Sequence, residues 1–128
     1  MIKKTWFQIL LIFLFILFSY LNILNNEFVW DDHSFIQGWS EIRSFENLPK
    51  FFTGILPQGH EGIYRPIRTV LYAISFALWG NNPFGYHLQA IALHFLSTVL
   101  VFLIVREITK HPLVAFLSGL LFGLHPVQ

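Results

Sequence analysis

The sequence predicts an all-α, multi-span helical membrane protein with three transmembrane helices and an outer loop bearing short interfacial helices. Two observations predict this class. Hydrophobic residues make up 55% of the chain and charged residues only 12%, whereas a soluble domain carries about 25% charged residues. Two apolar runs, at residues 6–24 and 84–106, are also long enough to cross the hydrocarbon core of a bilayer as helices.

The first apolar run, residues 6–24, would extend about 28 Å as a helix, which is close to the hydrocarbon thickness. Lys3 and Lys4 precede it. A cleaved signal peptide is the alternative, but its apolar region is normally shorter and is followed by a small-residue cleavage site. Residues 19–22, Ser-Tyr-Leu-Asn, offer no such site. We therefore expect a retained signal anchor.

Two further apolar runs follow an outer loop of about residues 25–83. The run 84–106 comes after Gly-Asn-Asn-Pro, which signals a helix start, and the run 112–127 begins at Pro112, a favourable first helical position. The link between these runs is short and basic. The positive-inside rule places this link and the N-terminus in the cytoplasm. The outer loop is then extracytoplasmic, and we expect the plasma membrane as its location.

One more apolar stretch, residues 67–79, lies inside the outer loop. It is too short to span the membrane comfortably and better suits an interfacial or re-entrant helix. Arg65 and Arg68 at its start and Trp79 at its end fit a helix that lies at the membrane surface. If this stretch did span, the N-terminus and the basic link would fall on opposite sides of the membrane.

Composition excludes several classes of function. The net charge is only +1, and no basic cluster indicates a nucleic-acid partner. The chain has no cysteine, which excludes disulfides and thiolate metal sites.

The best candidates for chemistry are Asp31 and Asp32, which follow the first apolar run closely. Adjacent residues do not share a face of a helix or a strand, so we expect one carboxylate to face a substrate and the other to cap a helix or orient its neighbour. A carboxylate at this place can act as a general base. The alternative is that either residue merely caps a following helix. A metal site built from this pair and His33 is weakly indicated, because three consecutive residues rarely converge on one ion.

A second candidate site begins at Tyr64, Arg65 and Pro66. Pro66 suits the first turn of a helix, whose free N–H groups and positive dipole end attract anions. Arg65 and Arg68 lie three residues apart and can face the same way. They could clamp a phosphate at the membrane surface. The alternative, that both arginines only contact lipid headgroups, stays open.

Histidines and small residues mark the two later apolar runs. His87 and His94 share one helix face, and we expect His94 to form an interhelical hydrogen bond rather than to bind metal. His125 ends the third run on the same side as Asp31. The small residues of this run recur every fourth position and predict close helix packing. They are Ala115, Gly119 and Gly123.

Taken together, these strings resemble the N-terminal part of the GT-C membrane glycosyltransferases of the transmembrane and tetratricopeptide-repeat type, to which the protein O-mannosyltransferases are more distant relatives. The resemblance covers nearly the whole chain and rests on an ordered set of motifs. The motifs are Phe28-Val29-Trp30-Asp31-Asp32, Tyr64-Arg65-Pro66, residues 79–87, His94 and His125-Pro126-Val127.

The resemblance implies transfer of a sugar from a polyprenyl-phosphate donor to a hydroxyl of a protein or glycan acceptor, on the extracytoplasmic side. It implies that Asp31 and Asp32 form the essential acidic motif. Substrate-binding candidates are Tyr64, Arg65, Arg68, His87 and His125. No cofactor is certain, although a divalent metal stays open, and the partners include membrane lipids. Residues 1–128 would form one N-terminal transmembrane module.

Two departures limit this resemblance. Relatives often carry Asn three residues after the position of His87, where this chain has Ala90. Relatives also continue beyond the His-Pro pair with an acidic residue, further spans and often a repeat domain, so we expect the chain to be a fragment that can be inactive alone. The alternative is a non-enzymatic small membrane protein or transporter fragment that assembles through helix packing.

Overall fold

The computed structural model describes residues 2–53 and 64–125, and these residues form helices and connecting turns without strands. This confirms the all-α prediction. The chain divides into two compact units. The central unit comprises Asn25–Tyr86, and the terminal unit combines Met1–Leu24 with His87–Gln128.

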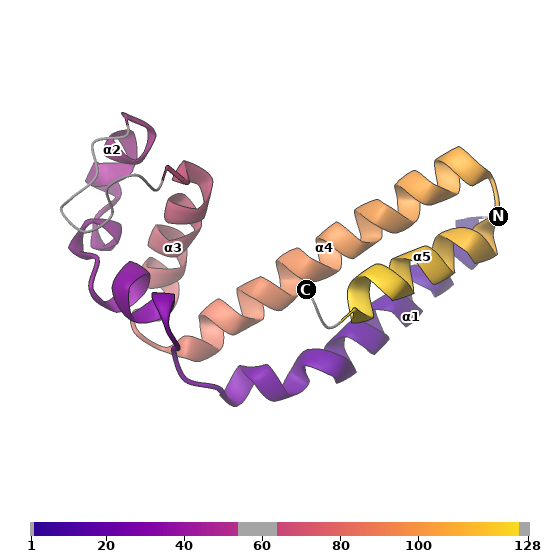
Figure 1. Cartoon of the computed structure of the whole chain (residues 1–128), viewed down its shortest axis with the longest axis horizontal. Coiled ribbons are helices and arrows are strands. Elements are labelled where there is room, and N and C mark those ends of the chain that lie inside the picture. Colours follow the sequence, from indigo (N-terminus) through magenta and orange to yellow (C-terminus); the bar gives the residue numbers. More distant parts are fainter. Residues whose placement is uncertain (1, 54–63, 126–128) are drawn as a thin grey trace. The chain divides into compact units, whose positions relative to one another are not determined.

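The terminal unit is a layer of long apolar helices (Figure 1). Its elements are α1 (Ile2–Tyr20), the 3₁₀ turn η1 (Leu21–Asn25), α4 (Pro83–Thr109, from His87 onward) and α5 (Pro112–Leu124). Its core contains Ile12, Ile16 and Phe102, each at most 1% exposed. Large apolar side chains on the outer faces stay exposed, such as Phe18 at 76% and Leu121 at 72%. An apolar exterior around an apolar core is what a lipid environment requires.

Two helices pass the length and hydropathy criteria for a membrane span, Lys4–Asn25 and Pro83–Thr109. They correspond to the predicted spans 6–24 and 84–106, and each extends further at both ends. The third predicted span, 112–127, corresponds to α5, which has 13 residues and is shorter than the ~20 residues that usually cross a bilayer. Two candidate spans are therefore present in the described part of the chain.

The small residues of α5 pack against other helices of the same chain, which confirms the predicted role of this series. A Cβ added at Gly119 would lie 3.2 Å from Ile12 Cδ1 and 3.3 Å from Phe102 Cβ. A Cβ added at Gly123 would lie 3.0 Å from Thr98 Cγ2. α5 thus approaches both α1 and α4 at distances that leave no room for larger side chains.

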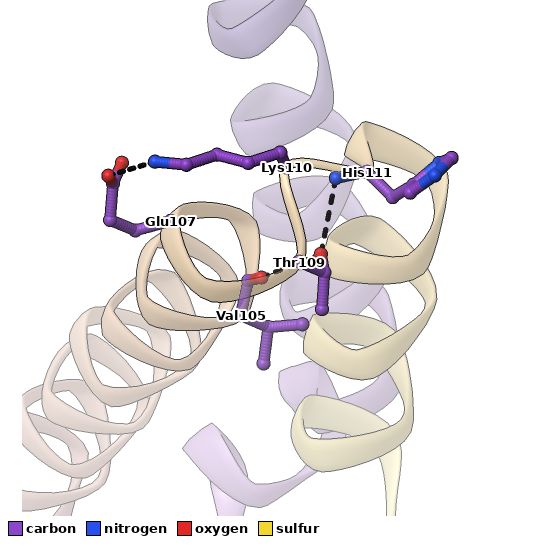
Figure 2. Close-up of polar contacts among 5 residues, drawn as sticks. All are labelled: Val105, Glu107, Thr109, Lys110 and His111. Atoms are coloured by element: carbon purple, nitrogen blue, oxygen red, sulfur yellow. Dashed lines mark hydrogen bonds and ion pairs between the residues drawn. The ribbon is translucent and has the colours of Figure 1, made fainter.

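The turn between α4 and α5 is closed by Thr109 and Lys110 (Figure 2). The Thr109 hydroxyl donates to the Val105 carbonyl at 2.8 Å and accepts from the His111 backbone N–H at 3.2 Å. Lys110 has a φ of 56° and donates its backbone N–H to the Arg106 carbonyl at 3.0 Å. This is the left-handed helix-ending motif that normally carries glycine. The Lys110 ammonium also pairs with the Glu107 carboxylate at the exposed end of the turn.

We expect Lys110→Gly to stabilise the α4–α5 turn by about 1 kcal/mol. The left-handed backbone conformation costs an L-residue about 1–2 kcal/mol, which glycine avoids. The greater freedom of glycine in the unfolded chain offsets about 0.5–1 kcal/mol of this stabilisation. The measurement is thermal unfolding of the chain in detergent micelles, followed by circular dichroism. Lys110→Ala is the control, since it removes the same charge but keeps the Cβ. A stability gain equal to that of Lys110→Gly would show that charge, not backbone strain, is responsible.

The central unit is built from short helical turns packed on α3 (Pro66–Trp79). The other elements are η2 (a π-helical turn, His33–Gln37), η3 (Ser40–Arg43), η4 (Phe45–Asn47) and α2 (Leu48–Thr53). Their core side chains include Ile36, Ile42 and Phe51, all at most 2% exposed. On α3, Ala73 faces this core, while Ile67 is 72% exposed. The predicted helix at 67–79 is confirmed as a helix that starts at Pro66.

Candidate functional site

The acidic pair lies on a tight turn of the central unit. The Asp32 backbone N–H donates to the Val29 carbonyl at 3.0 Å, and Asp32 Oδ2 accepts from the Val29 backbone N–H at 3.2 Å. Between these residues Trp30 has a φ of 48°, in the left-handed region that large residues seldom adopt. The two hydrogen bonds hold this strained conformation, and strain of this kind is often found at functional sites.

The two carboxylates have different surroundings. Asp31 is exposed, and its carboxylate accepts no hydrogen bond from any residue that the structure describes. Asp32 is partly buried and stands at the start of η2, but its side chain makes no capping hydrogen bond to that turn. The Asp32 side chain instead accepts from the Val29 backbone N–H, three residues earlier. That the two acids do different work stays a prediction.

Arg68 is the most constrained cation of the central unit. Its Cζ lies 4.2 Å from the centre of the Phe35 ring and 5.5 Å from the centre of the Tyr72 ring. Both distances are within the range of cation–π attraction. Its Nε is buried and has no hydrogen-bond partner among the described residues. Leaving a buried donor unpaired costs about 1–3 kcal/mol, so this guanidinium is held by the rings and still has capacity to bind an acceptor.

The acidic pair and the arginine pair both act on Tyr72. Burial raises the pKa of the Tyr72 hydroxyl above its ordinary value of 10.0. Arg68 opposes this rise in pKa, whereas Asp32 and then Asp31 add to it, and Arg65 opposes it more weakly. Arg68 lies over the rings of Tyr72 and of Phe35, and Phe35 is three residues after Asp32, so Arg68 and the turn that the acidic pair precedes are neighbours in the central unit.

Tyr72 was missed by the sequence interpretation. It lies four residues after Arg68, and this spacing places the two residues on one face of α3. That spacing was the available signal. Tyrosine is common in apolar helices, so the spacing alone does not separate this residue from the rest of the core.

Arg65 and Tyr64 precede α3. Pro66 occupies the first turn, as predicted, and the Arg65 carbonyl accepts hydrogen bonds from Thr69 N and Thr69 Oγ1, both at 3.1 Å. The Arg65 side chain is exposed. The Tyr64 hydroxyl donates to the Phe52 carbonyl at 3.1 Å, which ties the residue before α3 to α2. Tyr64 therefore has a structural contact in addition to its predicted binding role.

The histidine candidates belong to the terminal unit. His87 is partly buried on α4, and His125 is exposed directly after α5. Pro126 and Val127 of the same motif lie outside the described residues. The interhelical role expected for His94 is confirmed, because its Nε2 lies 2.9 Å from the Gly123 carbonyl oxygen. This contact satisfies one of the carbonyls that the end of α5 leaves open.

A metal site at the acidic pair gains no support from the described residues, in which no group of three or more His, Asp or Glu side chains could hold an ion. The Nδ1 atom of His33 lies 2.8 Å from Gln37 Oε1 within η2.

Comparison of the sequence with known proteins finds relatives with one kind of name. Protein O-mannosyl-transferase Tmtc1 of Drosophila melanogaster is 33% identical over 115 residues, and human protein O-mannosyl-transferase TMTC1 is 32% identical over 113 residues. Drosophila Tmtc2 is 29% identical over 117 residues. The chain is a homologue of the Tmtc-type protein O-mannosyl-transferases. The two Drosophila matches each cover 85% of this chain, and the human match covers 82%.

The homology concerns a limited part of each Tmtc-type relative. The matched region is 13% of Drosophila Tmtc1, 12% of Drosophila Tmtc2 and 13% of human TMTC1. No protein-family model matches the chain. No solved structure matches it either. The names of the relatives support a transferase of the O-mannosyltransferase type, and the apolar helices fit a membrane protein.

Proposed function

We propose that this chain is the N-terminal transmembrane module, residues 1–128, of an enzyme that transfers a mannosyl group from a polyprenyl-phosphate donor to a hydroxyl of a protein acceptor, on the extracytoplasmic side. The observation that carries the proposal is that Arg68 of α3 lies 4.2 Å from the Phe35 ring centre in η2, the turn that Asp31 and Asp32 directly precede. A general base beside a phosphate-binding cation is the arrangement that this transfer needs. The Tmtc-type relatives supply the class of reaction.

Asp31 is the base in this proposal. Its carboxylate takes the proton of the acceptor hydroxyl, while the acceptor oxygen attacks the anomeric carbon of the sugar. The bond between that carbon and the phosphate oxygen breaks, and the polyprenyl phosphate leaves with the electron pair. Asp31 suits this step because its carboxylate is exposed and carries no hydrogen bond from the described residues. Asp32 positions it by closing the turn on Val29.

Arg68 and Arg65 hold the phosphate of the donor. A guanidinium binds phosphate oxygens through paired N–H donors, and the first turn of the 14-residue α3 adds free backbone N–H groups. The contacts with the Phe35 and Tyr72 rings hold the Arg68 guanidinium in position before the donor arrives. Preorganised charge stabilises the negative charge that builds up on the leaving phosphate. His87, His125 and Tyr64 remain proposed substrate contacts.

The packing of the terminal unit supports the proposed topology. The Arg106 guanidinium hydrogen-bonds to the Thr5 hydroxyl, so the start of α1 and the end of α4 lie at one end of this unit. Lys4, Arg106 and Lys110 make that end basic, which favours the cytoplasmic side. With α1 and α4 as spans, the central unit is extracytoplasmic. α5 is then a third, incomplete or tilted membrane helix.

We also propose that α3 lies at the membrane interface. Its outward face carries Ile67, Ile74 and Leu78, which are 72%, 40% and 65% exposed. Its other face packs on the central unit. A helix with one apolar face free and one face bound to a folded unit fits the interface between lipid and water. This position would keep the donor phosphate, whose lipid tail lies in the membrane, within reach of Arg68.

The alternative is a non-enzymatic protein that assembles through helix packing. The surface that it would use, the small-residue face of α5, is already occupied. The small-residue series of α5 is covered by Ile12, Ile16, Thr98 and Phe102 of the same chain. These contacts leave no free small-residue face on α5 for a partner helix.

The proposed donor is tested by comparing two arginines of the central unit in the complete protein. Arg68→Gln is expected to raise KM for a polyprenyl-phosphate mannose at least tenfold, because it removes the charge that binds the phosphate. Arg43→Gln is the matched control, since Arg43 also lies over an aromatic ring, at 5.5 Å from the Phe76 centroid. The measurement is mannosyl transfer to an acceptor protein in membranes. Transfer from a nucleotide sugar alone, or equal effects of both variants, would contradict the proposal.

A further inference from the structure

A groove at the basic end of the terminal unit has no role in the proposed transfer. It lies between the start of α1, the last turn of α4 and the start of α5, and its volume is about 570 Å³. Its walls are mostly apolar, with two cations among them. The apolar residues are Phe7, Leu11, Pro112 and Phe116, and the cations are Lys4 and Arg106.

The groove is held in shape by polar contacts between its helices. Arg106 hydrogen-bonds to the Thr5 hydroxyl, and its Cζ lies 5.9 Å from the centre of the Phe102 ring. The Gln8 side chain donates to the Pro112 carbonyl at 3.2 Å, which fixes the start of α5 against α1. The cationic end and the apolar walls therefore belong to one packed arrangement of the three helices.

The two cations lie where a lipid headgroup would lie. Lys4 is the first residue of one candidate span, and Arg106 is within the last turn of the other. Leu11 is seven residues further along α1, which corresponds to a depth of about 10 Å at the rise of an α-helix. Charge at the membrane surface with an apolar channel directly below it matches a phosphate headgroup followed by an acyl chain.

The charge balance of the groove selects the headgroup. Among the described residues, no carboxylate lines the groove. The nearest acid along the chain, Glu107, forms its ion pair with Lys110 and interacts more weakly with Arg106. Lys4 and Arg106 thus present positive charge to a bound headgroup. An anionic headgroup complements this charge, whereas the phosphate of a zwitterionic headgroup is already balanced by the cation of the same headgroup.

We propose that this groove binds one anionic phospholipid, with the phosphate at Lys4 and Arg106 and an acyl chain against Phe7, Leu11 and Phe116. The bound lipid joins the start of α1 to the α4–α5 turn at the basic end of the terminal unit. This site is separate from the sugar-transfer site, which belongs to the central unit.

The test is native mass spectrometry of the full chain, released from detergent after incubation with phosphatidylglycerol or phosphatidylcholine. One phosphatidylglycerol is expected to stay bound, at an affinity at least tenfold above that for phosphatidylcholine. Lys4→Gln should lower this preference at least threefold, and the double variant with Arg106→Gln should abolish it. Lys4 is exposed, so Lys4→Gln alone decides the result if the double variant does not fold.

Lys50→Gln is the matched control, because it removes an exposed lysine of the central unit. It should leave the preference for phosphatidylglycerol unchanged. Equal retention of both lipids, an equal effect of Lys50→Gln, or full displacement of the lipid by millimolar inorganic phosphate would each overturn the proposal. The last result would show that the apolar walls do not bind an acyl chain.

Discussion

Replacing Asp31 with asparagine is expected to lower the rate of mannosyl transfer by about 10²- to 10⁴-fold, the range that a general base contributes. Asparagine has nearly the shape of aspartate but cannot accept the proton of the acceptor hydroxyl. Asp31 is exposed and carries no hydrogen bond from the described residues, so the substitution should leave membrane insertion and folding unchanged. The measurement is kcat for transfer by the complete protein in membranes, with the protein level determined in parallel.

Asp32 provides the matched comparison. Asp32→Asn retains an oxygen that can accept from the Val29 backbone N–H, whereas Asp32→Ala removes the acceptor that holds the strained turn at Trp30. We expect Asp32→Ala to be clearly worse than Asp32→Asn, and Asp31→Asn to be as severe as Asp31→Ala. The reverse order would assign the base to Asp32. Full activity of all four variants would remove the acidic pair from the mechanism.

Placing leucine at Gly119 is expected to destabilise the terminal unit by about 3 kcal/mol or more. Overpacking a well-filled core typically costs about 1–3 kcal/mol, and here a Cβ alone would already lie 3.2 Å from Ile12 and 3.3 Å from Phe102. The remaining carbons of leucine must displace α1 or α4. The measurement is the free energy of unfolding of the chain in micelles, from denaturant titration followed by circular dichroism.

Val114→Leu is the control for this prediction, since Val114 lies on the same helix and is 46% exposed. It adds apolar volume where no helix packs, so the free energy of unfolding should change by less than about 0.5 kcal/mol. Gly119→Ala should fall between the two variants. Equal stability of the Gly119→Leu and Val114→Leu variants would show that α5 does not pack closely on α1 and α4.

Local sequence signals predicted most of the elements. Pro66 and Pro112 each begin a helix where the first-turn rule expects one, and the apolar runs correspond to α1 and α4. The helix boundaries differ by a few residues, since neighbouring turns extend or shorten a helix beyond its apolar run. The third predicted span, residues 112–127, is matched only by the shorter helix α5. This helix ends at Leu124, and its 13 residues are few for a bilayer crossing.

The candidate site was predicted in pieces. The acids and the arginines were recognised from residue type and order, and the small-residue spacing on α5 was recognised from its four-residue period. The different surroundings of Asp31 and Asp32 could not be assigned from sequence, because they depend on a hydrogen bond to Val29 across a turn. The role of Phe35 and Tyr72 in holding Arg68 depends on contacts between η2 and α3.

Sequence by itself determined the helical class, the apolar runs and the presence of acids and cations suited to sugar transfer, since these follow from residue type and from periodicity along one segment. Tertiary structure decided which residues come together. It brought Arg68 against Phe35 and Tyr72, buried the small face of α5 within the chain, and brought Lys4 to Arg106 beside an apolar groove. The physical reason is that such contacts join residues distant in sequence, and their distances are set by packing rather than by local preference.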